Sequence, residues 1–306
     1  MEGITFYFDW EVIFMEWLQN ILGEAGAAAG SFISYFGEEI VLIAVLSLVY
    51  WCFDKERGRI LGLSICMGLV ANPMIKNVFL RRRPYFDNPG IKCFKPVDPE
   101  ADIYDISAQG FSFPSGHSTS AAIVYGGLAT QYKDRVFKLI GIAIPILVAI
   151  SRMAVGVHYP TDVLTGLLLG IAVLALSSFL YRSVKRRWVL YLCVFAISAL
   201  GIIYCRSNDY YTALGVMGGF FAGDLFEEKY VKFENTKSPL KCFVRVVCGT
   251  CVFMCLNVLL KLPFSDEFLH SATMAAYLVR TVRYFVLTFT VVGLYPILFI
   301  KIKKVF

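Results

Sequence analysis

The sequence predicts an all-α protein, a polytopic transmembrane helical bundle of about nine spans preceded by an N-terminal interfacial helix. Hydrophobic residues make up 58% of the 306 residues and charged residues 17%. Soluble domains average about 45–50% and about 25%. The mean hydropathy is +0.64. These values exclude a disordered chain, a coiled coil and a small disulfide-rich secreted domain.

Apolar runs of membrane-spanning length predict the elements in order. Residues 8–22 are too short and too polar to span, and their aromatic face predicts an amphipathic helix at the interface. We expect spans at roughly 37–53, 59–80, 117–132, 138–157, 161–181, 188–205, 210–226, 242–261 and 282–300. A polar loop, about 84–113, follows the second span. Residues 262–281 fit either an interfacial segment or part of a longer span.

Three parts are expected along the chain: an N-terminal interfacial segment (1–36), a core that carries the chemistry (37–182) and additional C-terminal spans (183–306). Glycines recur every four residues within two of the spans, which favours close helix packing. They are Gly166 and Gly170, and Gly215, Gly219 and Gly223.

Basic residues collect in alternate loops, around 55–59, 133–138, 182–187, 229–241 and 301–304. With nine spans these loops share one side of the membrane, which the positive-inside rule assigns to the cytoplasm. The loop 84–113 and the turn 152–160 are then extracytoplasmic. We expect a multi-pass protein of the cell membrane, with no nucleic-acid partner and with a homodimer as an open possibility.

The first cluster of polar residues is KNVFLRRRP, residues 76–84. Lys76 and Arg83 are about two helical turns apart, so a continuous helix would place them on one face, and Pro84 would end it. A cation inside an apolar span usually marks a functional site. The alternative is a snorkelling lysine beside a basic interfacial cluster.

The second cluster is FPSGHS, residues 113–118, directly before an apolar helix. Ser115 and Gly116 at a helix start would offer free backbone N–H groups to an anion. His117 beside them can exchange a proton near neutral pH. The alternative is an ordinary Ser cap with an interfacial histidine.

The third cluster joins Ser151 and Arg152 to His158 and Asp162. Asp162, in the first turn of the next span, can reach back to the His158 ring, fix its tautomer and free its other nitrogen as a nucleophile. The alternative is an Arg–Asp surface pair with a spectator histidine.

Together the clusters put Lys76, two arginines, a helix N-terminus and two histidines on one membrane face. This set suits a phosphoryl group in transfer, whose charge positioned cations stabilise. No carboxylates with metal-ligand spacing accompany it, so we expect neither a catalytic metal nor a cofactor.

At these residues the sequence resembles the type 2 phosphatidic acid phosphatase (lipid phosphate phosphatase) superfamily. The family's three signatures are matched by Lys76 through Arg83-Pro84, by Pro114-Ser115-Gly116-His117, and by Ser151-Arg152 through His158 and Asp162. The resemblance covers about residues 37–182. The nine-span layout is similar to that of glucose-6-phosphatase in topology.

The resemblance implies a role for each matched residue. His158 would attack phosphorus and form a phosphohistidine, Asp162 would orient it, and His117 would protonate the leaving oxygen and then activate water. The phosphoryl oxygens would be held by Lys76, Arg83, Ser115, Gly116 and Arg152. Arg81 and Arg82 would serve a second phosphate or the membrane surface.

The expected activity is hydrolysis of a lipid phosphate or diphosphate, such as a polyprenyl diphosphate (undecaprenyl diphosphate), phosphatidic acid or phosphatidylglycerophosphate. The alternatives are phosphotransfer to another lipid or sugar, hydrolysis of a soluble sugar phosphate, and a lipid transporter with a relic site. Membrane lipids are the expected surroundings of the substrate. The loop 85–113 carries five acidic and two basic residues together with phenylalanines, a rim that favours an amphiphile over a free dianion.

Overall fold

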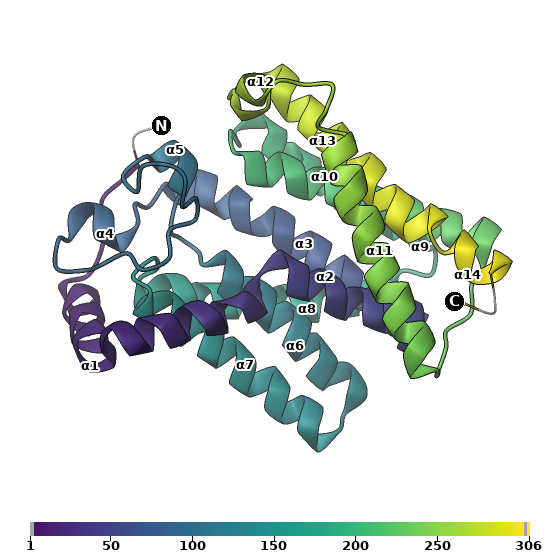
Figure 1. Ribbon diagram of the computed structural model, residues 1–306, viewed down its shortest axis with the longest axis horizontal. Helices are drawn as coiled ribbons and strands as arrows, with labels where there is room; N and C mark the ends of the chain where they lie inside the picture. Colours follow the sequence, from purple (N-terminus) through teal and green to yellow (C-terminus); the bar gives the residue numbers. More distant parts are fainter. Residues whose placement is uncertain (1–2, 303–304) are drawn as a thin grey trace. The chain divides into compact units, whose positions relative to one another are not determined.

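The computed structural model (Figure 1) describes residues 3–302 and 305–306. Regular structure in this part of the chain is helical, and the one extended pairing is an isolated parallel bridge between Ile4 and Arg81. The prediction of an all-α, polytopic bundle is confirmed.

The helices follow the predicted apolar runs closely. In order they are α1 (Asp9–Ser34), η1 (Tyr35–Gly37), α2 (Glu39–Leu48), η2 (Val49–Phe53), α3 (Lys55–Phe79), α4 (Pro84–Asp87), α5 (Ile106–Gln109), α6 (Gly116–Tyr132), α7 (Arg135–Ala154), α8 (Pro160–Ser183), α9 (Arg187–Ala199), η3 (Leu200–Ile203), α10 (Asn208–Phe226), η4 (Glu227–Val231), α11 (Pro239–Leu259), α12 (Asp266–His270), α13 (Met274–Phe289), η5 (Thr290–Leu294) and α14 (Ile297–Lys301).

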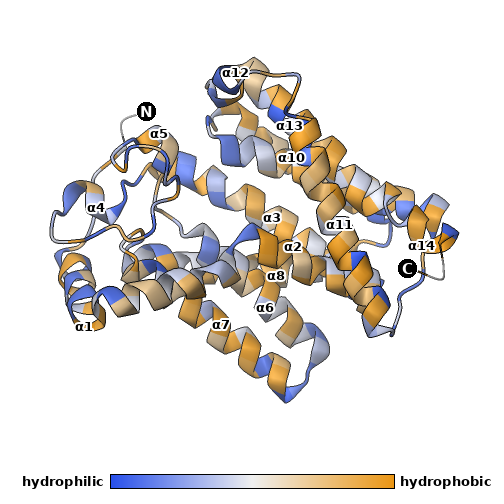
Figure 2. Ribbon diagram, in the orientation of Figure 1, coloured by the Kyte–Doolittle hydropathy of each residue, from blue (hydrophilic) through white to orange (hydrophobic). Residues whose placement is uncertain are grey.

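Membrane-spanning length is reached by fewer helices than the nine expected. Within the described residues five qualify by length and apolarity: Lys55–Phe79, Arg135–Ala154, Pro160–Ser183, Pro239–Leu259 and Met274–Lys301. A sixth span results if Asp9–Gly37 and Glu39–Phe53, bent by 42°, are counted together. Figure 2 shows long hydrophobic stretches on α7, α11 and α13. The protein is a multi-pass membrane protein, but nine spans are not confirmed.

The N-terminal helix is longer than residues 8–22, because α1 continues to Ser34 through Gly23, whose φ of 58° departs from helical geometry. Its exposed face carries Trp10 and Trp17, whereas Glu11 and Met15 are fully buried. One face of α1 therefore belongs to the protein interior.

The chain forms two compact units. The first contains the described residues up to Leu42 together with Met74–Leu174. In it α7 packs on α6 and on α1. A Cβ on Gly166 would come within 2.6 Å of the Ser115 carbonyl oxygen, and one on Gly170 within 2.6 Å of Ala122 Cβ. The glycines of α8 thus allow α6 to approach closely, as expected.

The second unit contains Ile43–Pro73 and Ala175–Phe306. Its helices α10 and α13 lie side by side (Figure 1). A Cβ on Gly215 or Gly219 would lie 2.4 or 2.5 Å from a carbonyl oxygen of α13, and one on Gly223 would lie 3.1 Å from the backbone N of Gly293. The predicted role of this glycine stripe in close packing is confirmed.

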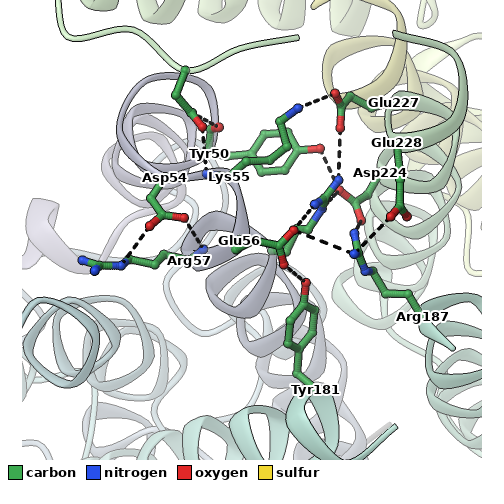
Figure 3. A network of polar contacts seen from close by, with 12 residues as sticks. Tyr50, Asp54, Lys55, Glu56, Arg57, Tyr181, Arg187, Asp224, Glu227 and Glu228 are labelled. Carbon is green, nitrogen blue, oxygen red and sulfur yellow. Dashed lines mark hydrogen bonds and ion pairs between the residues drawn. The ribbon is translucent and has the colours of Figure 1, made fainter. Parts of the chain in front are cut away.

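A buried network of charges joins helices within the second unit. Arg59 Nε donates to Asp224 Oδ1 at 2.7 Å, and its NH2 lies 3.2 Å from Glu227 Oε2. Lys55 Nζ lies 2.7 Å from Glu227 Oε1, and the Tyr50 hydroxyl donates to Asp224 (Figure 3). Both carboxylates are fully buried. Each buried charge has an opposite charge in contact, as burial requires.

Candidate active site

The three sequence clusters lie in the first unit, at helix ends. Each residue has a defined place: Lys76 in the last turn of α3, Arg83 as the N-cap of α4, Ser115 as the N-cap of α6, Gly116 and His117 in its first turn, Arg152 in the last turn of α7, His158 in the turn before α8 and Asp162 in the first turn of α8.

Lys76 and Arg83 do not share one continuous helix, so that expectation is wrong. Helix α3 ends at Phe79, and Leu80 takes a positive φ of 50°. The strand-like pairing of Ile4 with residues 80–82 holds the segment out of helical geometry, with Ile4 N–H donating to Leu80 O at 2.7 Å. Pro84 therefore begins α4 at its first position, where proline lacks no needed N–H, instead of ending α3.

Arg83 is buried and anchored by backbone carbonyl groups. Its Nε donates to Gln109 O at 2.8 Å, and its NH1 donates to Val157 O at 3.1 Å. The second bond reaches the residue before His158. The first cluster is thereby tied directly to the third.

The start of α6 is held against the start of α8. Ser115 caps α6, since its hydroxyl oxygen accepts from the Ser118 N–H at 3.4 Å and from the Ser118 hydroxyl at 3.1 Å. Its own N–H donates to Asp162 O at 3.0 Å. A serine hydroxyl that accepts twice retains its proton for donation. Ser115 can therefore cap α6 and still donate its hydroxyl proton to a bound anion.

Asp162 approaches His158 but does not hydrogen-bond to it. The distance from His158 Nδ1 to Asp162 Oδ2 is 3.5 Å, long for a hydrogen bond. Oδ2 accepts instead from the Tyr159 N–H at 2.8 Å, and Oδ1 accepts from Arg81 NH1 at 2.6 Å. These two donors fix the carboxylate in a position where Oδ2 is the oxygen that faces the imidazole.

His158 is a buried imidazole among cations. Burial, followed by the charges of Arg83, Arg152 and Lys76 and by His117, lowers the pKa of His158 well below its usual range. The ring is therefore neutral at physiological pH and retains a nitrogen lone pair. The three clusters meet at this ring, because Arg83 bonds the residue before His158 and the Ser115 N–H bonds Asp162 O.

Two buried groups of the site lack hydrogen-bond partners. Arg152 Nε and NH1 and His158 Nδ1 are inaccessible to solvent and bond to nothing in the described structure. Leaving such donors unpaired in a protein interior is unfavourable by about 1–3 kcal/mol each. A guanidinium with free donors, beside Arg83 and a helix N-terminus, is suited to an oxyanion with several oxygens.

Comparison with known proteins identifies the family of the chain. The model of the PAP2 superfamily matches residues 57–188, and that of the PAP2 superfamily phosphatase, transmembrane extension, matches residues 211–305. Phosphatidylglycerophosphatase B of Bacillus subtilis (strain 168) is 38% identical over 182 residues, which cover 56% of this chain and 78% of that protein. The chain belongs to the PAP2 superfamily.

Two further relatives match over shorter stretches. Undecaprenyl-diphosphatase of Sulfolobus acidocaldarius is 35% identical over 145 residues, 45% of this chain and 63% of that protein. Lipid A 1-phosphatase of Rhizobium etli is 35% identical over 104 residues, 34% of this chain and 40% of that protein. The chain thus spans less than two thirds of these two relatives. No solved structure matches the chain.

Within this PAP2 domain, Arg81 serves neither a second phosphate nor the membrane surface, and those expectations are wrong. Only 1% of Arg81 is exposed, and its guanidinium lies between Asp162 and Glu11, 2.6 Å from each. Sequence reasoning missed Glu11. The available signal was an acidic residue within the apolar run at 10–15, because a carboxylate in such a run needs a buried partner.

Gln109 is a second residue that the sequence did not reveal. It is fully buried at the centre of the PAP2 domain's long loop, where its Oε1 accepts from the Val97 N–H at 2.9 Å and its Nε2 donates to Asp98 O at 2.8 Å. The backbone carbonyl oxygen of Gln109 accepts a hydrogen bond from Arg83 Nε. Gln109 thus connects the loop's fold to a cation of the site.

The aspartates of the loop take part in its local structure. Asp87 accepts from Thr5 and from Arg82, and the carboxylates of Asp98, Asp102 and Asp105 accept from backbone N–H groups two residues ahead. They are turn-forming residues. Apolar side chains are exposed here as well: Phe94, Val97, Ile103 and Tyr104. The apolar part of the rim differs from the expectation because, of the phenylalanines Phe86, Phe94, Phe111 and Phe113, only Phe94 is exposed.

Proposed function

We propose that the protein is an integral membrane phosphatase that hydrolyses a lipid phosphate or diphosphate at the extracytoplasmic face, through a phosphohistidine on His158. Membership of the PAP2 superfamily and the names of the relatives support lipid phosphate chemistry. The side of the membrane rests on the alternation of basic loops along the sequence.

The observation that carries the proposal is the set of unpaired donors on Arg152 beside a neutral His158. Arg83, Lys76 and the N-terminus of α6 complete a positively charged site that offers a phosphoryl group both charge and hydrogen bonds. Preorganised donors of this kind stabilise the charge of the transferring group more than that of the ground state. The positive charge comes from side chains, so we propose that turnover needs no divalent metal.

In the first step, Nε2 of His158 attacks phosphorus while Nδ1 keeps its proton toward Asp162. Burial, followed by the charge of Arg152, holds the pKa of His117 well below its usual range in the empty site, so His117 gains its proton when the negatively charged phosphate binds. The bond from phosphorus to the leaving oxygen then breaks, and His117 gives this proton to that oxygen. The products are the free alcohol, or the lipid monophosphate when the substrate is a diphosphate, and a phosphohistidine whose ring is cationic. Asp162 lies where it stabilises that cation.

In the second step, neutral His117 removes a proton from water, and the oxygen attacks phosphorus. The phosphorus–nitrogen bond breaks, inorganic phosphate leaves, and His158 returns to its neutral form. His117 is half-buried and packs against Gly37, where a Cβ would lie 3.0 Å from His117 Cβ. Its greater exposure gives it access to water that the fully buried His158 lacks.

The surroundings of the site support a lipid as the substrate. The phosphoryl site lies at helix ends, so a headgroup reaches it while the acyl or prenyl chain stays in lipid. The exposed apolar side chains of the loop favour contact with that lipid. Polyprenyl diphosphate, phosphatidic acid and phosphatidylglycerophosphate are the proposed candidates, with phosphotransfer in place of hydrolysis as the alternative outcome.

The test is phosphate release by purified protein in one detergent, with a panel containing undecaprenyl diphosphate, phosphatidic acid, phosphatidylglycerophosphate and glucose 6-phosphate. We expect a lipid to have the highest kcat/KM, and we expect turnover to survive EDTA. A sugar phosphate turned over as efficiently as any lipid would contradict the substrate class. Activity lost with EDTA and restored by magnesium would contradict the cation-based mechanism.

A further inference from the structure

A chain of buried charges extends from His158 to the N-terminal helix. From His158 it passes through Asp162 and Arg81 to Glu11, near the start of α1. Asp162 and Glu11 are fully buried, and Arg81 is 1% exposed. Glu11 lies outside the three sequence signatures, and Arg81 lies within the first one without a role of its own there, yet both connect to the nucleophile through Asp162.

Every acceptor of Glu11 is engaged. Its Oε1 accepts from the Thr161 N–H at 3.0 Å and from the Thr161 hydroxyl at 2.6 Å, and its Oε2 accepts from the Phe8 N–H at 3.0 Å and from Arg81 NH2. All four of these contacts are donors, and none offers an acceptor for a carboxyl proton. The contacts of Glu11 are therefore those of a carboxylate.

Arg81 is held on all sides in a similar way. Its Nε donates to Phe6 O at 2.8 Å, its NH1 donates to both Thr161 Oγ1 and Asp162, and its guanidinium lies over the Tyr159 ring at 4.1 Å. Lysine could not make these contacts, because the planar fork bridges two carboxylates at once. The position of the Asp162 carboxylate is thus set by Arg81.

The charge balance gives Glu11 its significance. A single Asp162–Arg81 pair would be neutral and would provide no net negative charge for a cationic imidazole. With Glu11 on the far side of the guanidinium, two carboxylates share one cation, and the group keeps one net negative charge.

We propose that Arg81 and Glu11 are positioning residues of the catalytic site: Arg81 orients Asp162, and Glu11 preserves the net negative charge that stabilises the cationic ring of phosphorylated His158. The inference rests on the proposed function. Its consequence is that the N-terminal helix is part of the catalytic apparatus, although the chemistry lies on α6, α7 and α8.

The test compares four variants at equal amounts of folded, monodisperse protein: Glu11→Gln, Glu11→Asp, Glu11→Gln combined with Arg81→Gln, and Glu24→Gln. Glu24 lies on the same helix and is exposed, so its substitution removes an equal charge outside the network. We expect Glu11→Gln to lower kcat about 10- to 100-fold with little change in KM, the scale of one unit charge inside a protein. Glu24→Gln should match the wild type.

Rescue separates a charge effect from a purely structural one. Glu11→Asp keeps the charge and should retain most of kcat. The double variant restores one net negative charge on Asp162 but removes the guanidinium that orients it, so its kcat should stay well below that of the wild type. If Glu11→Gln yields no folded protein, Glu11→Asp and the double variant carry the comparison, and Glu11→Asp should be the more active of the two.

Three results would overturn the inference. The first is a Glu11→Gln variant with the kcat of Glu24→Gln, and the second is a double variant with the kcat of the wild type, because Arg81 would then not orient Asp162. The third is a Glu11→Asp variant as poor as Glu11→Gln. A wild-type protein that hydrolyses no phosphate of the panel would instead overturn the proposed function, and this inference with it.

Discussion

The backbone N–H of Ser115 donates to the carbonyl oxygen of Asp162 at 3.0 Å. This bond joins the N-terminus of α6 to the first turn of α8, and so joins the residues that would hold the phosphoryl group to the carboxylate that supports the nucleophile. The close approach depends on Gly166, one turn further along α8, which faces the Ser115 carbonyl oxygen.

Gly166→Ala should therefore destabilise the protein and lower activity. Its Cβ would lie 2.6 Å from Ser115 O, and a backbone atom of a helix end cannot move away cheaply. We expect a loss of about 1–3 kcal/mol, measured as a lower Tm in detergent. Gly126→Ala is the control, because its Cβ would make only an ordinary contact, 3.4 Å from Leu174. Equal Tm values for the two variants would contradict this account.

The roles of the two histidines can be separated by trapping the phosphoenzyme. Rapid acid-free denaturation during turnover of labelled substrate should yield an acid-labile phosphoprotein in the wild type and none in His158→Ala. His117→Ala should still form it from substrates with a good leaving group, because His117 acts on protons and not on phosphorus. A phosphoenzyme that persists in His158→Ala and vanishes in His117→Ala would reverse the assignment.

Removing the unpaired Arg152 should stabilise the protein while abolishing function. In the absence of phosphate, Arg152→Met replaces a buried cation with unsatisfied donors by an apolar side chain, and the free energy of unfolding should rise by about 1–3 kcal/mol. Inhibition by vanadate, an analogue of the transferring phosphoryl group, should be lost with activity. A lower Tm for Arg152→Met would show that the guanidinium is satisfied within the protein.

The matched control is Arg59→Met, also at a buried arginine. Arg59 contacts Asp224 and Glu227, so its removal leaves two buried carboxylates with one cation fewer. The expected effect has the opposite sign, a loss of about 3–5 kcal/mol. Similar Tm changes for the two methionine variants would mean that pairing does not govern the stability of these arginines.

The lowered pKa of His158 predicts how stability depends on pH. The folded protein holds the imidazole neutral, whereas the unfolded chain binds a proton with a pKa of about 6.5. Above about pH 6.5 neither state is protonated and His158 contributes no pH dependence. Below that pH the unfolded state binds the extra proton, so stability falls by up to about 1.4 kcal/mol per pH unit.

This contribution is isolated by comparing Tm from pH 8 down to pH 5 in the wild type and in His158→Gln. The decline on the acid side should be shallower in the variant, since glutamine does not titrate. Parallel curves would indicate that His158 is protonated to the same extent in both states.

Cysteine labelling tests the orientation of the site. In a background depleted of cysteine, Glu100→Cys and Lys185→Cys both place a thiol at an exposed position. An impermeant thiol reagent should modify the first in intact cells and the second only after permeabilisation, because basic loops lie in the cytoplasm. The reverse pattern would place the site on the cytoplasmic face.

Local sequence patterns predicted the helices and the three polar clusters. Apolar runs located α3, α7 and α8 within a few residues, since periodicity and length are local properties. The number of spans was harder to predict. Helix α6 has 17 residues, so hydropathy alone does not decide whether it crosses the bilayer.

The segment 80–83 could not be predicted from its own residues. Its departure from helix depends on backbone pairing with Ile4 and on the burial of Arg81 against Glu11, contacts separated by about 70 residues in the chain. Helix propensity favours three consecutive arginines in a helix, and tertiary contacts override it. For the same reason the local sequence did not reveal that Glu11 contacts Arg81.

The Arg59 network of the second unit has a consequence for how the chain is made. Arg59 is synthesised 165 residues before its partner Asp224. At about 5–20 residues per second, roughly 8–33 s pass during translation before α10 exists. During that interval the carboxylate within reach of Arg59 is Glu56, three residues earlier in the same helix and half exposed to solvent. The start of α3 therefore pairs its cation locally while it is made, and the buried pairing with Asp224 and Glu227 forms only when α10 and η4 have been added.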